Sequence, residues 1–382
     1  MSISGKSIAA CFRRRGRLTL PVALAAIALT IPVASAAAAT GPQVIATAAV
    51  GGGPLAVDVN PLTNTIYVVN SGDNTVSVIN GGTNAVTTTI PVGAAPHGVA
   101  ADVVNNTIYV ANVLSNTVSV INGGTNAVTA TIPVGGNPAS VAVNELFDAI
   151  YVTNFADDSV SVINALTNRV TATIPIGTTV SGVVADPLTG AVYVALPAAN
   201  AVAMINGLTN HVTATIPAGN APFEVAINSA TNTIYASNNG DSTVTVIDAF
   251  TNHVTATVAV GFSPFGVAAN SVTGNVYVAN IAADTVSVIN GRTNQVTATV
   301  PTGIRPFGMA VNTLTGRAYV SNSVDNTVQV IALPGRTATG RERGRIRQAH
   351  PPPLLGQVVE GDRARRVNRR AGRPVDVESL SG

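Results

Sequence analysis

The strongest constraint on this chain is a period of 42 residues that runs through most of its length. All seven tyrosines are spaced by this period, from Tyr67 to Tyr319. A proline recurs in phase with them, and only the fourth copy has another residue there, Val180. The prolines of the other copies are Pro54, Pro96, Pro138, Pro222, Pro264 and Pro306. Periods of about 20–50 residues are typical of solenoids, propellers and arrays.

Each copy of the repeat contains four short runs of strand-forming residues. In the copy that begins at Pro96 these runs cover residues 97–102, 107–112, 117–122 and 128–134. They are rich in Val, Ile, Thr and Ala, and Asn, Gly, Asp and Ser separate them, which is typical of strands joined by turns. The third run carries no charge on either face, as expected for a sheet packed between two neighbours. Four antiparallel strands in 42 residues match the size of one propeller blade.

A glycine closes each copy, where the outer strand turns toward the next blade. These glycines are Gly51, Gly93, Gly135, Gly177, Gly219, Gly261 and Gly303. We expect a positive φ at this position, because glycine tolerates that conformation better than other residues do. Thr-Asn recurs six times in the turn before the outer strand, from 83–84 to 293–294, and both side chains commonly hold turns through local hydrogen bonds.

The two ends of the repeat region predict a closed ring. Complete copies begin at residues 54, 96, 138, 180, 222 and 264, and a last copy begins at 306 but loses the pattern after Ile331, before its outer strand. Residues 44–51, ahead of the first copy, have the pattern of an outer strand. We therefore predict an all-β domain over residues 37–333, a seven-bladed β-propeller of four-stranded antiparallel blades that this N-terminal strand closes. Closure leaves no long strand edge exposed.

The segments on either side of the predicted propeller differ from it in composition. Residues 1–36 have a basic start, an apolar run over about residues 18–31 and the small-residue sequence Ala34-Ser35-Ala36, the layout of a secretory signal peptide. We expect a secreted or cell-envelope protein, with a membrane contact only if this leader stays uncleaved. Residues 334–382 carry eleven Arg against five acids. They are predicted to be a disordered tail, unless they arise from a shifted reading frame.

Charge and cysteine content exclude several classes of function. The propeller segment has thirteen Asp and Glu against four Arg, a net charge of −9, although the whole chain carries +2. This acidity argues against a nucleic-acid partner. Cys11 is the only cysteine and precedes the apolar run, so the predicted propeller has no disulfide, thiolate metal site or cysteine nucleophile. We expect a monomer whose rim contacts a protein or a cell-wall polymer.

Departures from the repeat mark candidate functional residues, because the fold already explains the consensus positions. If the first strand of each blade lines the central channel, the residues beside the recurrent proline surround one mouth. The departures there are His97, Phe223, Glu224, Phe265, Arg305 and Phe307. A mostly apolar concavity with a few convergent polar groups is the usual form of a ligand site. In the structural alternative, the phenylalanines fill the channel and Glu224 pairs with Arg305.

Aspartates recur in the turns between the second and third strands of the blades. They are Asp73, Asp157, Asp158, Asp241, Asp284 and Asp325. Asp is an ordinary turn residue, and weak Ca²⁺ binding, or attraction of a basic partner, is the alternative explanation. The candidates for such a metal site are Asp73, Asp157, Asp241 and Asp325. We predict no other cofactor.

Two histidines share one repeat position, in the turn before the outer strand. His211 and His253 lie there on consecutive copies. A structural zinc site needs four ligands and a catalytic site three, and no further ligand is evident near these two residues. We therefore expect both histidines to be exposed to solvent.

The sequence Tyr151-Val152-Thr153-Asn154 and its variants in other copies carry a family resemblance. The variants are Tyr67-Val68-Val69-Asn70, Tyr109-Val110-Ala111-Asn112, Tyr277-Val278-Ala279-Asn280 and Tyr319-Val320-Ser321-Asn322. With the segments at 116–123 and 128–135, they resemble the YVTN-repeat β-propeller family over about residues 44–333. The fourth copy departs most, with Val180 and with Leu196-Pro197 after the second strand.

This resemblance implies a secreted or cell-surface propeller, commonly without an assigned reaction. The fold is similar to that of seven-bladed lactonases, nitrite-reductase haem d1 domains and amine-dehydrogenase heavy chains, but no position here matches their catalytic motifs. Our leading hypothesis is a binding or scaffold module without catalysis. The alternative is a lactonase-like hydrolase that uses Glu224, His97 and Arg305. A quinone- or haem-dependent redox propeller ranks lowest, because the repeat has no Trp or Cys and few His.

Overall fold

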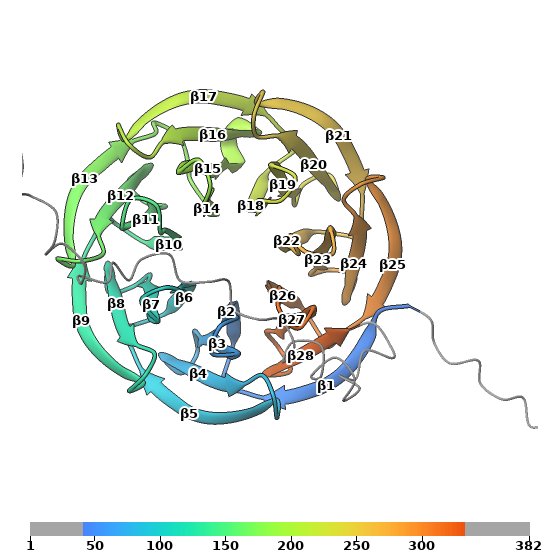
Figure 1. Cartoon of the computed structure of the whole chain (residues 1–382), viewed down its shortest axis with the longest axis horizontal. Coiled ribbons are helices and arrows are strands. Elements are labelled where there is room, and N and C mark those ends of the chain that lie inside the picture. The colour runs from blue at the N-terminus through green and yellow to red at the C-terminus, as the bar shows by residue number, and fades with distance from the viewer. Residues whose placement is uncertain (1–40, 333–382) are drawn as a thin grey trace, which may run out of the picture. The chain divides into compact units, whose positions relative to one another are not determined.

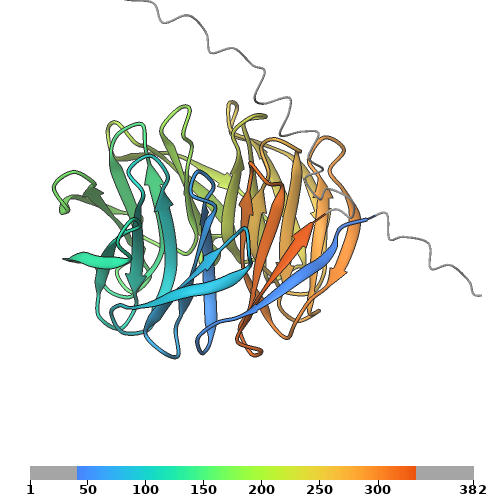
Figure 2. The ribbon, with the colours of Figure 1, turned by 60° about the horizontal axis from the view of Figure 1, so that its bottom comes forward.

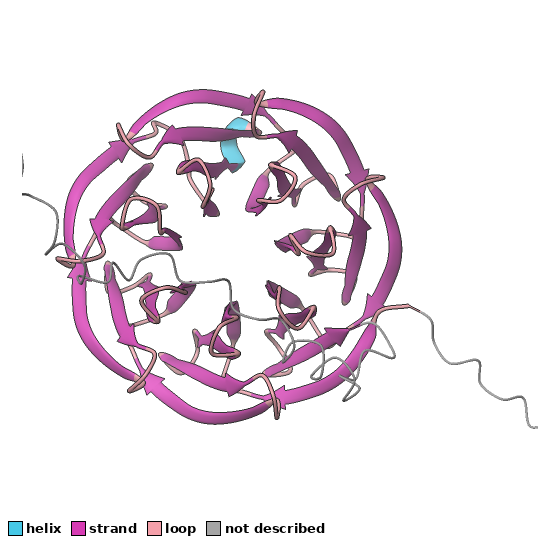
Figure 3. Cartoon of the chain, viewed as in Figure 1, coloured by secondary structure: helices cyan, strands magenta, loops and turns pink. Residues whose placement is uncertain are grey.

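The computed structural model describes residues 41–332, which form 28 β-strands in seven four-stranded sheets arranged as a ring (Figure 1). The predicted leader, 1–36, and the predicted tail, 334–382, lie outside the described residues. Figure 3 shows that strands make up nearly all of the ring. None of the helical structure within 41–332 is long and apolar enough to cross a membrane. The predicted all-β seven-bladed propeller is confirmed.

The four strands of each blade follow one another from the centre of the ring to its outside (Figure 1). The innermost strands are β2 (Pro54–Asn60), β6 (Pro96–Asp102), β10 (Pro138–Asn144), β14 (Val183–Ala185), β18 (Pro222–Asn228), β22 (Pro264–Ala269) and β26 (Pro306–Asn312). The second strands are β3 (Thr65–Asn70), β7 (Thr107–Asn112), β11 (Ala149–Asn154), β15 (Ala191–Leu196), β19 (Thr233–Asn238), β23 (Asn275–Asn280) and β27 (Arg317–Asn322). We number the blades 1 to 7 in this order.

The third and outer strands complete the blades. The third strands are β4 (Thr75–Asn80), β8 (Thr117–Asn122), β12 (Ser159–Asn164), β16 (Ala201–Asn206), β20 (Thr243–Asp248), β24 (Thr285–Asn290) and β28 (Thr327–Ala332). The outer strands of blades 1 to 6 are β5 (Ala85–Pro91), β9 (Ala127–Pro133), β13 (Arg169–Pro175), β17 (His211–Pro217), β21 (His253–Ala259) and β25 (Gln295–Pro301). Neighbouring strands within a blade pair antiparallel, and in blade 2, for example, Asn112 lies opposite Thr117.

The N-terminal strand supplies the outer strand of blade 7. β1 (Gln43–Ala49) pairs antiparallel with β28, from Gln43 opposite Ala332 to Ala49 opposite Thr327. Figure 2 shows β1, in blue, beside the orange-red strands of the last blade. The two ends of the repeat region thus share one sheet, and the predicted closure by an N-terminal strand is confirmed.

The hydrophobic core lies between neighbouring blades. Successive side chains of a strand point to opposite faces of its sheet, so Ile108 and Val110 pack toward blade 1, whereas Tyr109 and Ala111 pack toward blade 3. Each of the seven core clusters among the described residues joins two adjacent blades. Burial on both faces explains why the strands carry apolar or small residues on both sides, and such burial contributes about 25 cal/mol per Å² of apolar surface.

A buried asparagine fastens the second strand to the third in six blades. Asn112, at the end of β7, donates from Nδ2 to Thr117 Oγ1 at 3.1 Å and to Ser119 Oγ at 3.0 Å on β8. We call this group, and its equivalents in other blades, the asparagine lock. The equivalent asparagines, each donating to the hydroxyl five residues later, are Asn70, Asn154, Asn238, Asn280 and Asn322. The asparagine that ends the Tyr-Val-x-Asn sequence is therefore a structural residue.

The same asparagine explains the glycine that closes each copy. A Cβ atom added at Gly93 would lie 2.6 Å from Cγ of Asn112 in the next blade. The equivalent distance to the asparagine side chain is between 2.5 and 2.8 Å at Gly51, Gly135, Gly219, Gly261 and Gly303. Of the seven glycines only Gly177 has a positive φ, of 80°. The expectation of a positive φ at this position was wrong for the other six, where glycine is needed for close approach instead.

Blade 4 lacks the asparagine lock. Leu196 takes the place of the asparagine, and Ala201 and Ala203 take the places of the two hydroxyl residues. These three side chains lie with the fully buried Val180 in one apolar cluster. The turn that follows β15 is a 3-10 turn over Pro197–Ala199, drawn in cyan in Figure 3. Blade 4 therefore keeps the blade fold with apolar contacts at this point.

Candidate functional site: the central channel

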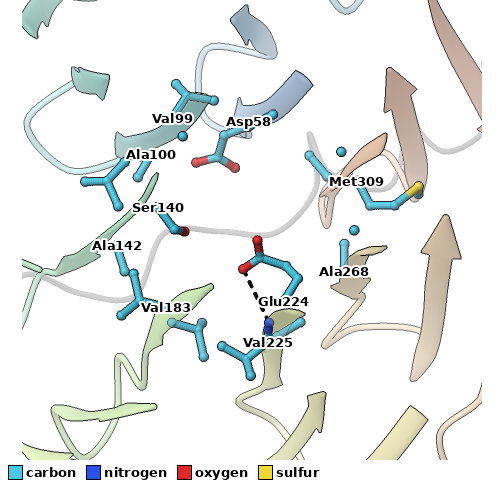
Figure 4. A pocket seen from close by; sticks show the side chains of 18 of the residues that line it. Asp58, Val99, Ala100, Ser140, Ala142, Val183, Glu224, Val225, Ala268 and Met309 are labelled. Carbon is cyan, nitrogen blue, oxygen red and sulfur yellow. Dashed lines mark hydrogen bonds between the residues drawn. The ribbon is translucent and has the colours of Figure 1, made fainter. Parts of the chain in front are cut away.

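The innermost strands of all seven blades surround a channel at the centre of the ring. Its volume is about 450 Å³, which lies within the range of about 300–1,000 Å³ found for small-molecule sites. Gly, Ala and Val make up most of the wall. The polar side chains that line it are Asp58, His97, Ser140, Glu145 and Glu224. Figure 4 shows Asp58, Ser140 and Glu224 directed into the channel.

Glu224 lies on β18 at a repeat position where most blades have a glycine. The equivalents are Ala56, Gly98, Ser140, Gly182, Gly266 and Gly308. A Cβ at Gly98 would lie 2.7 Å from the carbonyl oxygen of Ala139 in the next blade, so close approach of neighbouring inner strands explains the consensus. At Gly182 a Cβ would lie 2.4 Å from Oε1 of Glu224. The missing side chain at Gly182 therefore gives the carboxyl group its room.

The surroundings of Glu224 disfavour its charged form. The backbone N–H of Val225 donates to Oε1 at 3.3 Å (Figure 4), and this contact alone stabilises the carboxylate only weakly. The side chain is partly accessible from the channel, but the blades around it displace most of the bulk water. This burial raises the pKa of Glu224 to about 7. Ionised and protonated forms are therefore both populated near neutral pH.

Asp58 on β2 is a channel residue that the sequence analysis missed. Its repeat equivalents are Ala100, Ala142, Val184, Ala226, Ala268 and Ala310. Asp58 accepts the N–H of Val59 on Oδ1 and the N–H of Ala101 in blade 2 on Oδ2, both at 2.8 Å. Burial raises its pKa to about 6, although the two hydrogen bonds oppose that rise. Asp58 lies two residues further along its strand than the repeat position of Glu224. Its departure from the repeat is therefore visible in the sequence in the same way as that of Glu224.

Four predicted funnel residues meet at the mouth where the inner strands begin. We call His97, Phe223, Phe265 and Phe307 the aromatic collar. The ring centroid of Phe265 lies 3.9 Å from that of Phe223 and 4.0 Å from that of Phe307, with tilted planes. His97 meets Phe307 edge to face at 5.6 Å, a favoured geometry for aromatic pairs. The structure therefore brings these four side chains together, and three of them, His97, Phe265 and Phe307, line the channel.

His97 is held in one orientation by the neighbouring blade. Its Nδ1 lies 2.9 Å from the carbonyl oxygen of Ala139, and because a carbonyl only accepts, we assign the proton to Nδ1. Burial lowers the pKa of His97 below its usual value, against the opposing effect of this hydrogen bond. The ring is therefore neutral near pH 7, and Nε2 remains as a hydrogen-bond acceptor.

The structure does not bring Arg305 into the channel. This residue precedes β26 in an exposed loop, with φ of 57°, and its backbone N–H donates to Asp284 Oδ1 at 2.8 Å. It is not among the residues that line the channel, whereas Glu224 and His97 are. The three groups predicted for hydrolysis are thus not gathered on one cavity wall.

The aspartates predicted as weak metal candidates hold loops. The carboxylates of Asp73, Asp157, Asp241 and Asp325 each accept a backbone N–H from the loop that enters their own blade, at 2.5 to 2.8 Å. All four are exposed and belong to different blades. Their oxygens therefore perform the turn function that the sequence analysis favoured, and Ca²⁺ binding stays a prediction.

The two histidines at the outer strands lie away from the channel. His211 begins β17 and His253 begins β21, and both are exposed. His211 Nδ1 lies 2.6 Å from the carbonyl oxygen of Thr209. Within residues 41–332, His, Asp and Glu do not gather in groups of three or more that are placed to hold a metal ion.

The fold and the channel define a seven-bladed β-propeller with a central cavity. A family model described as YNCE-like beta-propeller matches residues 18–140. Among solved structures, a chain of hydrazine synthase from Kuenenia stuttgartiensis is similar, with a TM-score of 0.68, 18% identity, and coverage of 73% of this chain and 95% of that chain. An identity this low shows the fold alone. No curated protein matches the chain, and the YVTN-repeat family stays a prediction.

Proposed function

We propose that this propeller is a binding module of the cell envelope or the extracellular space, with a small ligand in its central channel. The observation that carries the proposal is the pair of carboxyl groups, Asp58 and Glu224, in a wall where other blades have Gly, Ala, Ser or Val. Ionisable groups in an enclosed, mostly apolar wall disfavour folding unless they are paired. Groups with pKa values perturbed in this way gather at functional sites.

Contact of the rim with a protein or a cell-wall polymer forms the second part of the proposal. Large apolar side chains are exposed at the tips of several turns: Leu62 and Leu188 after innermost strands, and Leu208 and Phe250 after third strands. Phe250 is 85% exposed. Exposed apolar side chains on the rim are available for contact with a partner, and contiguous apolar patches commonly mark interaction sites. Export is supported by the sequence of residues 1–36, which lie outside the described residues.

Thermal unfolding of the full chain tests the channel as a ligand site. A ligand that binds only the folded protein raises the midpoint as its concentration exceeds its dissociation constant. We expect at least one member of a panel of amines, lactones, sugars and divalent cations to raise the midpoint, and Glu224→Gln to reduce that shift. Asp148→Asn removes an exposed charge outside the channel and serves as the control. An equal shift in Glu224→Gln, or no shift with any compound, would contradict the proposal.

Hydrolysis of a lactone or ester is the second candidate. It is favoured by the position of Glu224 in the channel wall, where burial raises the pKa to about 7, a value that suits a general acid or base at neutral pH. It is opposed by the position of Arg305 outside the channel wall. Turnover of a lactone that Glu224→Gln abolishes without unfolding the protein would support it. The low-ranked redox hypothesis gains no support from hydrazine synthase, because that likeness shows the fold alone.

A further inference from the structure

The polar side chains that line the channel are mostly hydrogen-bond acceptors. Asp58 and Glu224 contribute carboxyl groups to its wall, and Glu145 follows β10 at the end opposite the aromatic collar. Neither Lys nor Arg is among the residues that line the channel. A cleft lined by one sign of charge focuses the field and concentrates ions of the opposite sign. The electrostatics of the channel therefore favour a cation.

The aromatic collar adds to this preference at the other end. Phe265 and Phe307 line the channel beside His97, and the faces of aromatic rings attract cations. The Nε2 atom of His97 carries a lone pair, because Nδ1 is used as the donor to Ala139 at 2.9 Å. An anionic ligand would find no Lys or Arg among the side chains that line the channel, and the hydroxyl of Ser140 is the neutral side-chain donor among them.

The shape and chemistry of the wall point to an organic cation and not a metal ion. Figure 4 shows Val99, Val183 and Met309 among the apolar side chains around the two carboxyl groups. A hard metal ion such as Ca²⁺ takes about six to eight oxygen ligands, and the described residues hold no group of three or more metal-binding side chains. An ammonium group needs fewer contacts, and the alkyl chain attached to it gains by leaving water for this wall.

We propose that the channel binds a small organic cation whose ammonium group meets Glu224 and Asp58 while its alkyl part packs against the apolar wall. This inference rests on the proposed function, because it names the ligand class of the same channel. Both oxygens of Asp58 already accept a backbone N–H, whereas Glu224 accepts one at 3.3 Å on a single oxygen. Glu224 therefore makes the principal contact, and Asp58 adds charge.

The ionisable groups of the channel set the pH dependence of this binding. Burial raises the pKa of Asp58 to about 6 and that of Glu224 to about 7, so both lose their charge as the pH falls. His97 gains charge in the same direction, and Glu145 is the fourth ionisable group that faces the channel. The ammonium ion keeps its charge throughout, so its affinity rises between about pH 5 and about pH 8. Near neutral pH, binding releases protons from Glu224.

Isothermal titration calorimetry on the full chain tests the proposal with n-butylammonium chloride. The probes 1-butanol and sodium butyrate have the same chain length without the positive charge, and calcium chloride supplies a cation without the alkyl part. We expect n-butylammonium alone to bind, with an affinity that rises with pH and a heat that depends on the buffer through proton release. Glu224→Gln should weaken binding about tenfold, the loss expected for one charged hydrogen bond. Asp148→Asn, outside the channel, should leave it unchanged.

The remaining outcomes contradict the inference, and they show whether the proposed function fails with it. If 1-butanol binds as tightly as n-butylammonium, or if butyrate binds, the channel is a ligand site but not one for cations, and the proposed function survives. If calcium binds and n-butylammonium does not, the ligand class is wrong. If no probe binds, the inference fails, and the thermal unfolding panel tests the proposed function separately. If circular dichroism shows that Glu224→Gln is unfolded, the pH profile of the unaltered chain replaces it, since an affinity that does not change with pH contradicts the inference.

Discussion

Blades 2 and 4 pair their second and third strands in the same register but hold these strands together in opposite ways. Asn112 lies opposite Thr117 in blade 2, and Leu196 lies opposite Ala201 in blade 4 at the same register. In blade 2 the amide of Asn112 donates to the hydroxyl groups of Thr117 and Ser119. In blade 4 the equivalent side chains form part of an apolar cluster with Val180. The same backbone arrangement is therefore compatible with a hydrogen-bonded polar group or with an apolar cluster between the second and third strands.

The substitutions at residues 196, 201 and 203 of blade 4 therefore form one structural change. A buried amide needs hydrogen-bond partners, so the asparagine and its hydroxyl partners have to be replaced together. Gly177 belongs to the same change, because without the asparagine a Cβ there would have nothing within 4 Å. Within the lock, Asn112 Oδ1 is buried without a hydrogen-bond partner among the described residues. Replacement of the whole lock by apolar residues therefore costs little free energy of unfolding. Glu224 and Asp58, in contrast, depart singly and face the channel.

The largest effect should come from breaking the lock with a single substitution. Asn112→Leu leaves the hydroxyl groups of Thr117 and Ser119 without their donor and presses a branched side chain against Gly93. We expect the free energy of unfolding to fall by about 3 kcal/mol in urea denaturation. Leu196→Asn is the converse test in blade 4, because its amide would meet only alanines, and a similar loss is expected. A loss below about 1 kcal/mol in both variants would contradict the comparison.

Alanine at the closing glycine should destabilise the protein more in blade 2 than in blade 4, although the difference is smaller than the effect of breaking the lock. In Gly93→Ala the new Cβ would lie 2.6 Å from Asn112 Cγ, and the resulting overpacking is expected to cost about 2 kcal/mol. In Gly177→Ala nothing lies within 4 Å, but φ is 80°, and that conformation costs about 1 kcal/mol for a residue with a Cβ. Thermal and urea midpoints of the two variants measure the difference. Equal losses would show that close approach to the asparagine is not the reason for glycine.

The smallest effect should follow from exchanging the whole lock. The triple variant Leu196→Asn, Ala201→Thr, Ala203→Ser gives blade 4 the side chains of blade 2. We expect its free energy of unfolding to lie within about 1 kcal/mol of the unaltered chain, because each polar group regains its partner. Comparison with Leu196→Asn alone gives the coupling energy between the sites. A triple variant as unstable as the single one would show that the surroundings of blade 4, and not the lock itself, require apolar residues.

Several local features of the fold were predictable because they depend on neighbouring residues. Turn residues such as Asp73 and strand residues such as Tyr109 take the roles that their types suggest, since turns and strand periodicity are local properties. The reason for glycine at position 93 was not predictable, because it is the side chain of Asn112 in the next blade. Leu196 and Pro197 mark the turn of blade 4 as unusual in the sequence, but the compensating alanines are recognised only through their contacts.

The repeat was enough to predict seven blades, four strands in each and a ring closed by an N-terminal strand, because a repeated pattern of alternating side chains permits few other packings. Which departures from the repeat share a cavity depends on how the folded blades are placed around the axis, and this was not predictable from the repeat. Asp58 and Glu224 come from blades 1 and 5 and line one channel, whereas Arg305 begins the last blade and stays outside the wall. The physical reason is that a side chain faces the channel only where its inner strand and the neighbouring blade leave room, as Gly182 does for Glu224.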